Sequence, residues 1–305
     1  MGSNPQHGTG QVLPPSKVDL FTKGIVHCDV YPAIDPLTKS DCTGKAVLIT
    51  GASRGFGRAI AVGYALAGAS GIAIAARSDL ADTTAAVLSA AKAAGRPKPN
   101  LLQLPMDVAD AASVRSAAAE VEAAWGRLDI IVSNAGYMAS FALLLDGDDE
   151  SYRKAWDVNF WGTYNVSKAF LPLMLKEGDK TIITISSLAA HFAGPGGGSY
   201  HVSKLALARL TEQIYEEYKD QGLLAYSVHP GGTPTELSDK LPDVFKFRMT
   251  DTPELAGHSL PFLTTRRLEW LGGRWLSCKW DLPELLNMEK QIVKENLLKF
   301  KCSGF

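Results

Sequence analysis

A glycine-rich octapeptide, T-G-A-S-R-G-F-G at residues 50–57, constrains the fold more than any other feature of this sequence. It follows an apolar run at 46–50 that predicts a buried strand, and it leads into an apolar stretch at 58–62 that predicts a helix. Glycines at such a junction permit a tight turn, close approach of the backbone to phosphates, and close helix packing, while the helix N-terminus favours an anion. A glycine-rich turn alone could be a structural loop, but its position between strand and helix favours a dinucleotide site.

The same alternation of strand and helix continues through the chain. Five further short apolar runs predict strands, and Ala-rich or amphipathic stretches between them predict helices. This order predicts an α/β protein with a single-domain Rossmann fold, in which a doubly wound parallel β-sheet is flanked by helices on both faces. The predicted strands are 46–50, 72–76, 101–104, 128–133, 181–186 and 224–229, and the predicted helices after the first are 81–94, 113–125, 152–174 and 199–218.

The segments outside this pattern predict the domain organisation. Residues 1–43 contain many Gly, Pro, Ser and Asn residues with little periodicity, so we expect an N-terminal extension followed by a catalytic domain at 44–280. Prolines punctuate residues 233–262, where we expect a substrate loop. Residues 281–305 predict a C-terminal helical tail with one amphipathic helix at 281–301, which packs either on its own subunit or against a second copy.

Composition and charge argue against several classes of function. The 31 basic and 32 acidic residues are interspersed and give a net charge of −1, so we expect no nucleic-acid partner and no membrane partner. No run of 18 apolar residues and no signal-like N-terminus is present, from which we expect a cytoplasmic location. We expect no metal site, because the four cysteines lack the spacing of metal ligands. They are Cys28, Cys42, Cys278 and Cys302.

The spacing Tyr-x-x-x-Lys occurs twice, at Tyr164–Lys168 and at Tyr200–Lys204. Only Tyr200 follows a serine at the end of a predicted strand, Ser187, so we expect Tyr164 to be a helix-packing residue. Residues i and i+4 share one face of a helix, and a nearby cation lowers the pKa of a phenol from about 10. The second pair therefore predicts an acid–base tyrosine, and Ser187 is placed to donate a hydrogen bond to a substrate oxygen.

Taken in order over residues 44–275, these motifs resemble the short-chain dehydrogenase/reductase family, in which T-G-x-x-x-G-x-G stands where this chain has residues 50–57. The resemblance implies that Tyr200 is the catalytic tyrosine and that Lys204 also binds the nicotinamide ribose. It further implies that Ser187 polarises the carbonyl group and that Asn159 anchors a water that relays protons.

The resemblance also implies a nicotinamide dinucleotide and the residues that bind it. Asp107 resembles the aspartate that holds the adenine, residues 133–136 resemble the family's N-N-A-G with Ser133 in place of the first Asn, and residues 230–235 resemble its P-G-x-x-x-T. The serine changes the local hydrogen bonding of the sheet. We expect the cofactor to be bound by Gly51, Ser53, Arg54, Gly55, Phe56, Gly57, Arg77, Ser78, Asp107, Val108, Asn134, Ala135, Gly136, Tyr200, Lys204, Pro230, Gly231, Thr233 and Thr235.

The end of the second predicted strand indicates which dinucleotide binds. An acidic residue there would hold the ribose diol of NAD(H), whereas this chain has Arg77, and Arg54 in the glycine turn adds a second cation. Because a guanidinium matches the geometry of a phosphate, NADP(H) is favoured, although NAD(H) is possible. The alternative is that both arginines face solvent or pair with Asp79 and Asp82.

The resemblance implies an NADP(H)-dependent oxidoreductase that interconverts a ketone and a secondary alcohol. Loops expected to face the nicotinamide, at 137–141, 188–199 and 236–248, are rich in apolar and aromatic residues, which favours a hydrophobic carbonyl or alcohol. The extended tails resemble those of a fungal subgroup in which many members act on secondary metabolites. The alternatives are a non-redox enzyme of the same fold, catalysing dehydration, isomerisation or cyclisation, and an NADP(H)-sensing binding protein. Family members often associate through the helices at 152–174 and 199–218, so we expect a homodimer or homotetramer.

Overall fold

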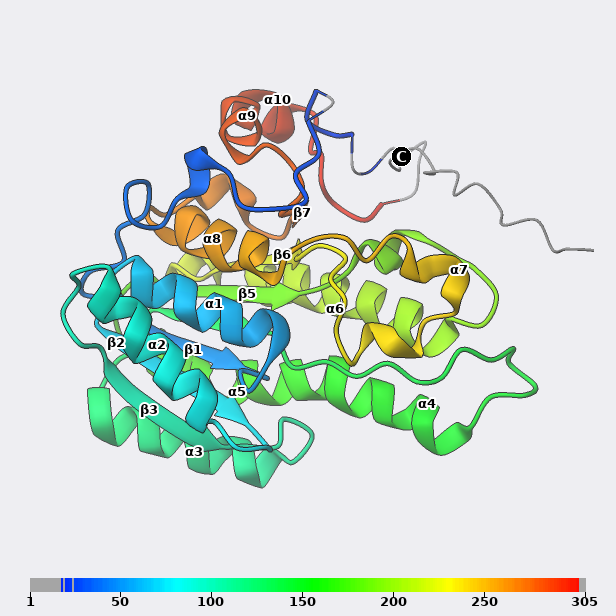
Figure 1. The fold of residues 1–305 in the computed structure, drawn as a ribbon, viewed down its shortest axis with the longest axis horizontal. Coiled ribbons are helices and arrows are strands. Elements are labelled where there is room, and N and C mark those ends of the chain that lie inside the picture. Colours follow the sequence, from blue (N-terminus) through cyan, green and yellow to red (C-terminus); the bar gives the residue numbers. More distant parts are fainter. Residues whose placement is uncertain (1–17, 19, 24, 302–305) are drawn as a thin grey trace, which may run out of the picture.

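The computed structural model describes residues 18, 20–23 and 25–301, and in this part of the chain one parallel sheet of seven strands forms the centre (Figure 1). Its order is β3-β2-β1-β4-β5-β6-β7, so the direction of winding reverses between β1 and β4. This confirms the predicted single-domain, doubly wound Rossmann fold. The strands are β1 (Ala46–Thr50), β2 (Gly71–Ala76), β3 (Asn100–Pro105), β4 (Ile130–Ser133), β5 (Thr181–Ile185), β6 (Leu224–His229) and β7 (Trp275–Ser277).

Helices cover both faces of the sheet, and this explains why the strands are continuous apolar runs. Successive side chains of β1 point to opposite faces, so Val47 and Ile49 belong to one core cluster and Ala46 and Leu48 to the other. In Figure 1 the helices α1, α2 and α8 cover one face, and α3, α5 and α6 cover the other. Their bounds are α1 (Gly55–Leu66), α2 (Ala81–Ala93), α3 (Ala111–Trp125), α5 (Gly162–Met174), α6 (Gly198–Tyr218) and α8 (Pro253–Thr264).

The helices α1 and α8 cross in backbone contact at two glycines. A Cβ atom on Gly63 would lie 1.8 Å from the carbonyl oxygen of Gly257, and one on Gly257 would lie 2.6 Å from that of Ala59. Only glycine allows so close an approach. The loop that follows β6 ends at Pro253, where α8 begins. The crossing therefore anchors the end of this loop against α1, the helix that follows the glycine turn.

The helical region predicted at 152–174 consists of three pieces. The helix α4 (Asp149–Trp156) continues into a π-helical turn at Asp157–Trp161 and then into α5. Single π-turns inside helices are frequent at functional sites, and Asn159 occupies this one. The π-turn accounts for the interruption of the regular helix.

Short helical segments connect the larger elements. Beyond β6 the chain forms the short helix α7 (Asp243–Lys246) before α8 begins. No helix in the described part of the chain is long and apolar enough to cross a membrane. The 3-10 turns are Pro32–Ile34, Leu188–His191, Lys219–Gln221, Ser238–Lys240 and Glu269–Leu271.

The C-terminal region differs from the prediction in two ways. Instead of one helix at 281–301 the structure has two short helices, α9 (Leu282–Asn287) and α10 (Glu289–Lys294), so that prediction was wrong. The backbone leaves the helix after α10, where Asn296 and Leu298 have φ of 48° and 64°. Residues 302–305, with Cys302, lie outside the described residues. The strand β7 was not predicted, because three residues are too few to show a strand pattern.

The described part of the N-terminal extension packs on the same core as the sheet. Ile34 is fully buried in that cluster, and Val26 forms an antiparallel bridge with Trp280. In Figure 1 the blue N-terminal segment lies beside the red helices α9 and α10. The division at 43/44 and 280/281 stays a prediction about segments of the sequence, while residues 1–17, 19 and 24 lie outside the described residues.

Candidate active site

Four neighbouring strands bring the predicted site residues to one edge of the sheet. The glycine turn at 50–57 follows β1, Asn134 follows β4, Ser187 follows β5 and Pro230 follows β6. Because the strands are parallel, their carboxyl ends lie at the same edge, and the winding reverses between β1 and β4. This is the position at which open α/β sheets bind ligands.

The three side chains predicted to share the chemistry lie together. Tyr200 and Lys204 lie near the start of α6, with the Lys204 ammonium 5.6 Å from the centre of the Tyr200 ring. Burial raises the pKa of Tyr200, and a hydrogen bond with Ser187 acts in the opposite direction.

Lys204 is buried between the ends of two strands. Its side chain is 3% exposed, and its ammonium donates a hydrogen bond of 2.8 Å to the carbonyl oxygen of Ile185. Burial lowers its pKa to about 8, because desolvation disfavours the charged form. A Cβ atom on Gly136 would lie 3.7 Å from this ammonium, so the loop after β4 passes directly beside it.

The side chain of Asn159 positions the loop after β4 and the first turn of α6. Its amide nitrogen donates to the carbonyl oxygen of Tyr137 (2.9 Å) and to Ser203 Oγ (3.0 Å), and its Oδ1 accepts from the backbone N–H of Tyr137 (2.8 Å). Ser203 in turn donates to the backbone oxygen of Tyr200 (2.9 Å). A fully buried amide thus connects the loop after β4 to the turn that carries the tyrosine. Its predicted role with a relay water stays a prediction.

The glycine turn has the backbone expected of a diphosphate cradle. Gly51 and Gly55 have φ of 64° and 54°, which favour glycine. A Cβ atom on Gly57 would lie 2.3 Å from the carbonyl oxygen of Gly51 and 2.6 Å from Asn134 Nδ2. Position 57 therefore admits no side chain, and the first N–H groups of α1 are placed as donors for an anion.

The loop after β4 is pinned to this turn. The backbone N–H groups of Asn134 and Ala135 both donate to Thr50 Oγ1 at 3.0 Å, and the Asn134 amide donates to the carbonyl oxygen of Thr50 at 2.8 Å. Ser133, which stands in place of the expected asparagine, donates to Thr163 Oγ1 at 3.1 Å. The shorter side chain thus bonds to α5.

Two arginines lie at the expected adenosine end, and neither pairs with Asp79 or Asp82. Arg77 lies 3.7 Å from Asp107, and Arg54 forms an ion pair of 2.7 Å with Glu236. Both guanidinium groups are largely exposed. The hydroxyl groups of Ser53 and Ser78 are hydrogen-bonded to each other at 3.0 Å beside them.

The remaining predicted residues fall into the same region. A Cβ atom on Gly55 would lie 3.6 Å from the methyl group of Thr235, so the loop after β6 reaches the glycine turn. Thr233 Oγ1 is buried without a hydrogen-bond partner among the described residues, as expected of a group that receives a ligand. Phe56 packs on the core, and Val108 lies against Gly162 of α5.

Sequence reasoning missed the groups that hold the loop after β6. Gly231 has φ of 117°, and the N–H of Gly232 donates to the fully buried carboxylate of Asp251 at 2.6 Å. Lys279 forms an ion pair of 2.5 Å with the same carboxylate. These residues are distant in sequence, so no local spacing could have indicated them.

The decoy pair Tyr164–Lys168 makes a similar contact in a different place. The Lys168 ammonium donates to the Tyr164 hydroxyl at 3.3 Å, Lys168 is exposed, and the Tyr164 ring contacts the exposed Trp161. The spacing alone therefore produces a phenol–ammonium contact. What distinguishes Tyr200 is the serine and the converging strand ends.

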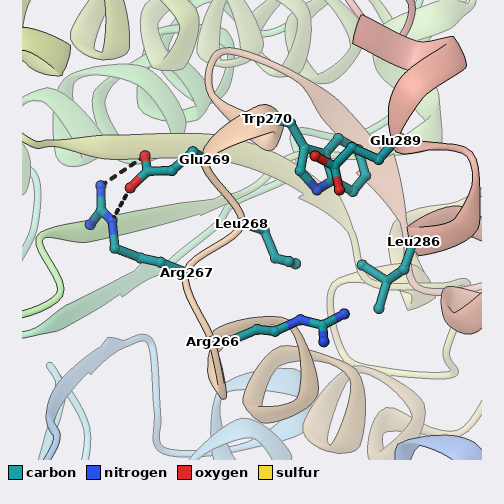
Figure 2. A pocket seen from close by; sticks show the side chains of 7 residues that line it. All are labelled: Arg266, Arg267, Leu268, Glu269, Trp270, Leu286 and Glu289. Atoms are coloured by element: carbon teal, nitrogen blue, oxygen red, sulfur yellow. Dashed lines mark hydrogen bonds and ion pairs between the residues drawn. The ribbon is translucent and has the colours of Figure 1, made fainter.

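A hollow of about 430 Å³ elsewhere contains none of the predicted site residues (Figure 2). In it Arg267 binds both carboxylate oxygens of Glu269, and Arg266 lies opposite Leu286. The described residues also contain no group of three or more His, Cys, Asp and Glu side chains that could hold a metal ion. The strand-end cluster is therefore the candidate site.

Comparison with known proteins reveals similar chains in fungi. The short chain dehydrogenase mpl6 of Monascus purpureus is 46% identical over 277 residues, which cover 90% of this chain and 94% of that protein. The short chain dehydrogenase pigC of Monascus ruber is 40% identical over 301 residues, which cover 97% and 98%.

A solved structure and a family model are also similar to this chain. A short chain dehydrogenase structure from Pseudomonas syringae superposes with a TM-score of 0.70 at 29% identity and covers 79% of this chain and 96% of that one. The family model described as short chain dehydrogenase matches residues 45–244. Members of that family are oxidoreductases with a nicotinamide dinucleotide cofactor. The chain belongs to the short-chain dehydrogenase family.

Proposed function

We propose that this protein is an NADP(H)-dependent oxidoreductase that interconverts a ketone and a secondary alcohol. The observation that supports this best is the position of Tyr200 beside Lys204 on α6, with Ser187 at the end of β5, at the edge of the sheet where the glycine turn also lies. The turn fits a dinucleotide, because Gly51 and Gly55 have positive φ and Gly57 lets the turn close tightly at the start of α1, where free N–H groups can meet a diphosphate.

In the reduction, the dinucleotide, when bound, would supply a hydride to the carbonyl carbon. Tyr200 gives its phenolic proton to the carbonyl oxygen, and Ser187 donates a hydrogen bond to the same oxygen as negative charge develops on it. The Lys204 ammonium stabilises the phenolate that remains and binds the nicotinamide ribose. A water held at Asn159 resupplies the proton through Lys204.

The preference for NADP(H) rests on the adenosine end. Arg54 and Arg77 present two guanidinium groups, and Ser53 and Ser78 present two hydroxyl groups, where the 2′-phosphate would lie. Their exposed ion pairs with Glu236 and Asp107 are weak enough to exchange for a phosphate. NAD(H) stays the alternative cofactor.

We further propose a hydrophobic substrate of the secondary-metabolite type. The loops expected to face the nicotinamide carry the exposed rings of Phe192, Phe245 and Phe247, and similar chains occur in Monascus and Aspergillus. A homodimer or homotetramer would cover exposed apolar side chains on the helical region at 149–174 and on α6, such as Trp161 and Val202.

The test is a spectrophotometric assay with NADPH or NADH and a panel of hydrophobic ketones, in which the reduced-nicotinamide absorbance is followed. We expect Tyr200→Phe to abolish turnover, by at least about 1,000-fold, and to leave NADPH binding within twofold, because only the proton donor is lost. Tyr164→Phe, at the decoy pair, is the matched control and should retain wild-type turnover.

Turnover retained by Tyr200→Phe would refute the assignment. NADPH binding without consumption in any ketone reaction would favour a non-redox enzyme or a sensing protein instead.

A further inference from the structure

A second phenol, Tyr137, lies beside the candidate site and has no role in the proposed reaction. It directly follows Gly136, whose Cβ position is 3.7 Å from the Lys204 ammonium. Both its backbone N–H and its carbonyl oxygen are hydrogen-bonded to the Asn159 side chain. The backbone of Tyr137 is therefore held in place directly after Gly136, the residue that lies beside the catalytic lysine.

Two ammonium groups lie over the Tyr137 ring. Lys240 Nζ is 4.0 Å from the ring centre and donates to the carbonyl oxygen of Met138 at 2.8 Å, and Lys154 Nζ is 5.2 Å from the same centre. The phenolic oxygen is 3.0 Å from Ser151 Oγ. The pKa of Tyr137 is lowered, chiefly by the hydrogen bond with Ser151 and then by Lys240.

Lys240 belongs to the loop after β6 and contacts the loop after β4. Its contacts with Tyr137 and Met138 join this loop to the one that follows β4. A second contact between the same loops is the pair of rings Phe141 and Phe245, 5.9 Å apart. The ammonium of Lys240 therefore lies between two loops that are expected to enclose the substrate.

The positive charge at this place has no carboxylate partner in the described part of the chain. Within the same loop Lys246 is paired with Asp243, whereas Lys240, like Arg248, forms no ion pair among the described residues, and neither does Lys154. The nearby Asp148 is used as the N-cap of α4, where it accepts from the N–H of Ser151 at 2.7 Å.

We propose that Lys240, held over Tyr137, recognises an anionic substituent of the substrate, such as a carboxylate or an acidic phenol on an aromatic ketone. The inference rests on the proposed function and adds the charge of the substrate to it. One hydrogen bond to Met138 leaves the ammonium two further N–H donors, and a charge-assisted hydrogen bond to a carboxylate would use one of them. The neighbouring rings suit the aromatic part of the same molecule.

The test compares a tetralone carboxylate with its methyl ester as substrates. We expect the wild-type enzyme to prefer the acid, and Lys240→Gln to raise KM for the acid at least tenfold while kcat for both compounds and KM for the ester change less than twofold. Lys240→Arg should retain the preference, because it keeps the charge. Lys154→Gln is the matched control: it removes the same charge from α4, farther from the ring centre and outside the loop after β6, and should change KM for the acid less than threefold.

Equal changes of KM for acid and ester in Lys240→Gln, or a wild-type enzyme without preference for the acid, would overturn the inference. A merely structural role of Lys240 in closing the loops would affect both compounds alike. If neither compound is reduced, the proposed function fails for this substrate class, and naphthoate binding, followed by intrinsic fluorescence, decides the inference separately. Tenfold weaker binding to Lys240→Gln than to wild type supports it, and equal binding overturns it.

Discussion

At the scale of single residues, the burial of Lys204 makes the stability of the fold depend on pH. Its pKa falls to about 8 from 10.5, so between these values the unfolded chain binds more protons than the folded one. The free energy of unfolding therefore gains a contribution that grows as pH rises through this window. We expect wild type to gain about 2 kcal/mol relative to Lys204→Met between pH ~7 and pH ~10, as measured by urea unfolding.

Lys168→Met is the matched control for this measurement, because it removes an exposed lysine at the same spacing from a tyrosine. Its free energy of unfolding should follow that of wild type across the pH range within about 0.5 kcal/mol. Parallel pH curves for Lys204→Met and wild type would show that the ammonium is not desolvated as the structure indicates.

At the scale of elements, the crossing of α1 and α8 depends on Gly63. A Cβ atom there would lie 1.8 Å from a backbone oxygen of Gly257, so the helices must move apart and loosen the loop before Pro253. We expect Gly63→Ala to lower the free energy of unfolding by about 1–3 kcal/mol in urea unfolding. Gly198→Ala in α6, where the nearest atom would be 3.9 Å away, should change it by no more than about 0.5 kcal/mol. An equal loss in both variants would contradict the packing argument.

The elements also show what the sequence could and could not predict. Continuous apolar runs predicted six strands because a parallel sheet covered on both faces buries every residue of a strand. The same periodicity misled at the C-terminus: Leu285, Ile292 and Leu297 pack on one core cluster although the helix is broken between them. Periodicity reports which residues are buried and not whether the backbone continues as one helix.

In the candidate site, the sequence predicted those residues whose contacts follow from local spacing. It did not predict the residues that meet only through tertiary contacts. Tyr200 and Lys204 lie one helical turn apart, so their contact follows from sequence. Lys240 contacts Tyr137 from about 100 positions away, and Glu236 reaches Arg54 from a still greater distance in the chain. These contacts depend on how the loop after β6 folds back over the sheet edge, and no pattern in the sequence encodes that.

At the scale of the whole molecule, the two ends of the described chain complete the core together. Trp280 is 1% exposed, its indole N–H donates to the carbonyl oxygen of Val18 at 2.7 Å, and its ring packs on Phe21 and Trp275. One side chain thus joins the described N-terminal segment to β7 and to the start of the region of α9. The described parts of both terminal segments thus pack on the same core as the sheet.

Trp280→Ala tests this coupling of the two ends. Truncation leaves a large cavity and removes the hydrogen bond to Val18, so we expect a loss of about 3–5 kcal/mol in the free energy of unfolding by urea titration. Limited proteolysis should then cleave both the N-terminal segment and the region after β7 at least tenfold faster, because both ends lose the same anchor. Leu145→Ala, at a large apolar residue that is 97% exposed, is the control and should change neither quantity beyond about 0.5 kcal/mol or twofold. Faster cleavage at only one end would show that the two segments dock independently of each other.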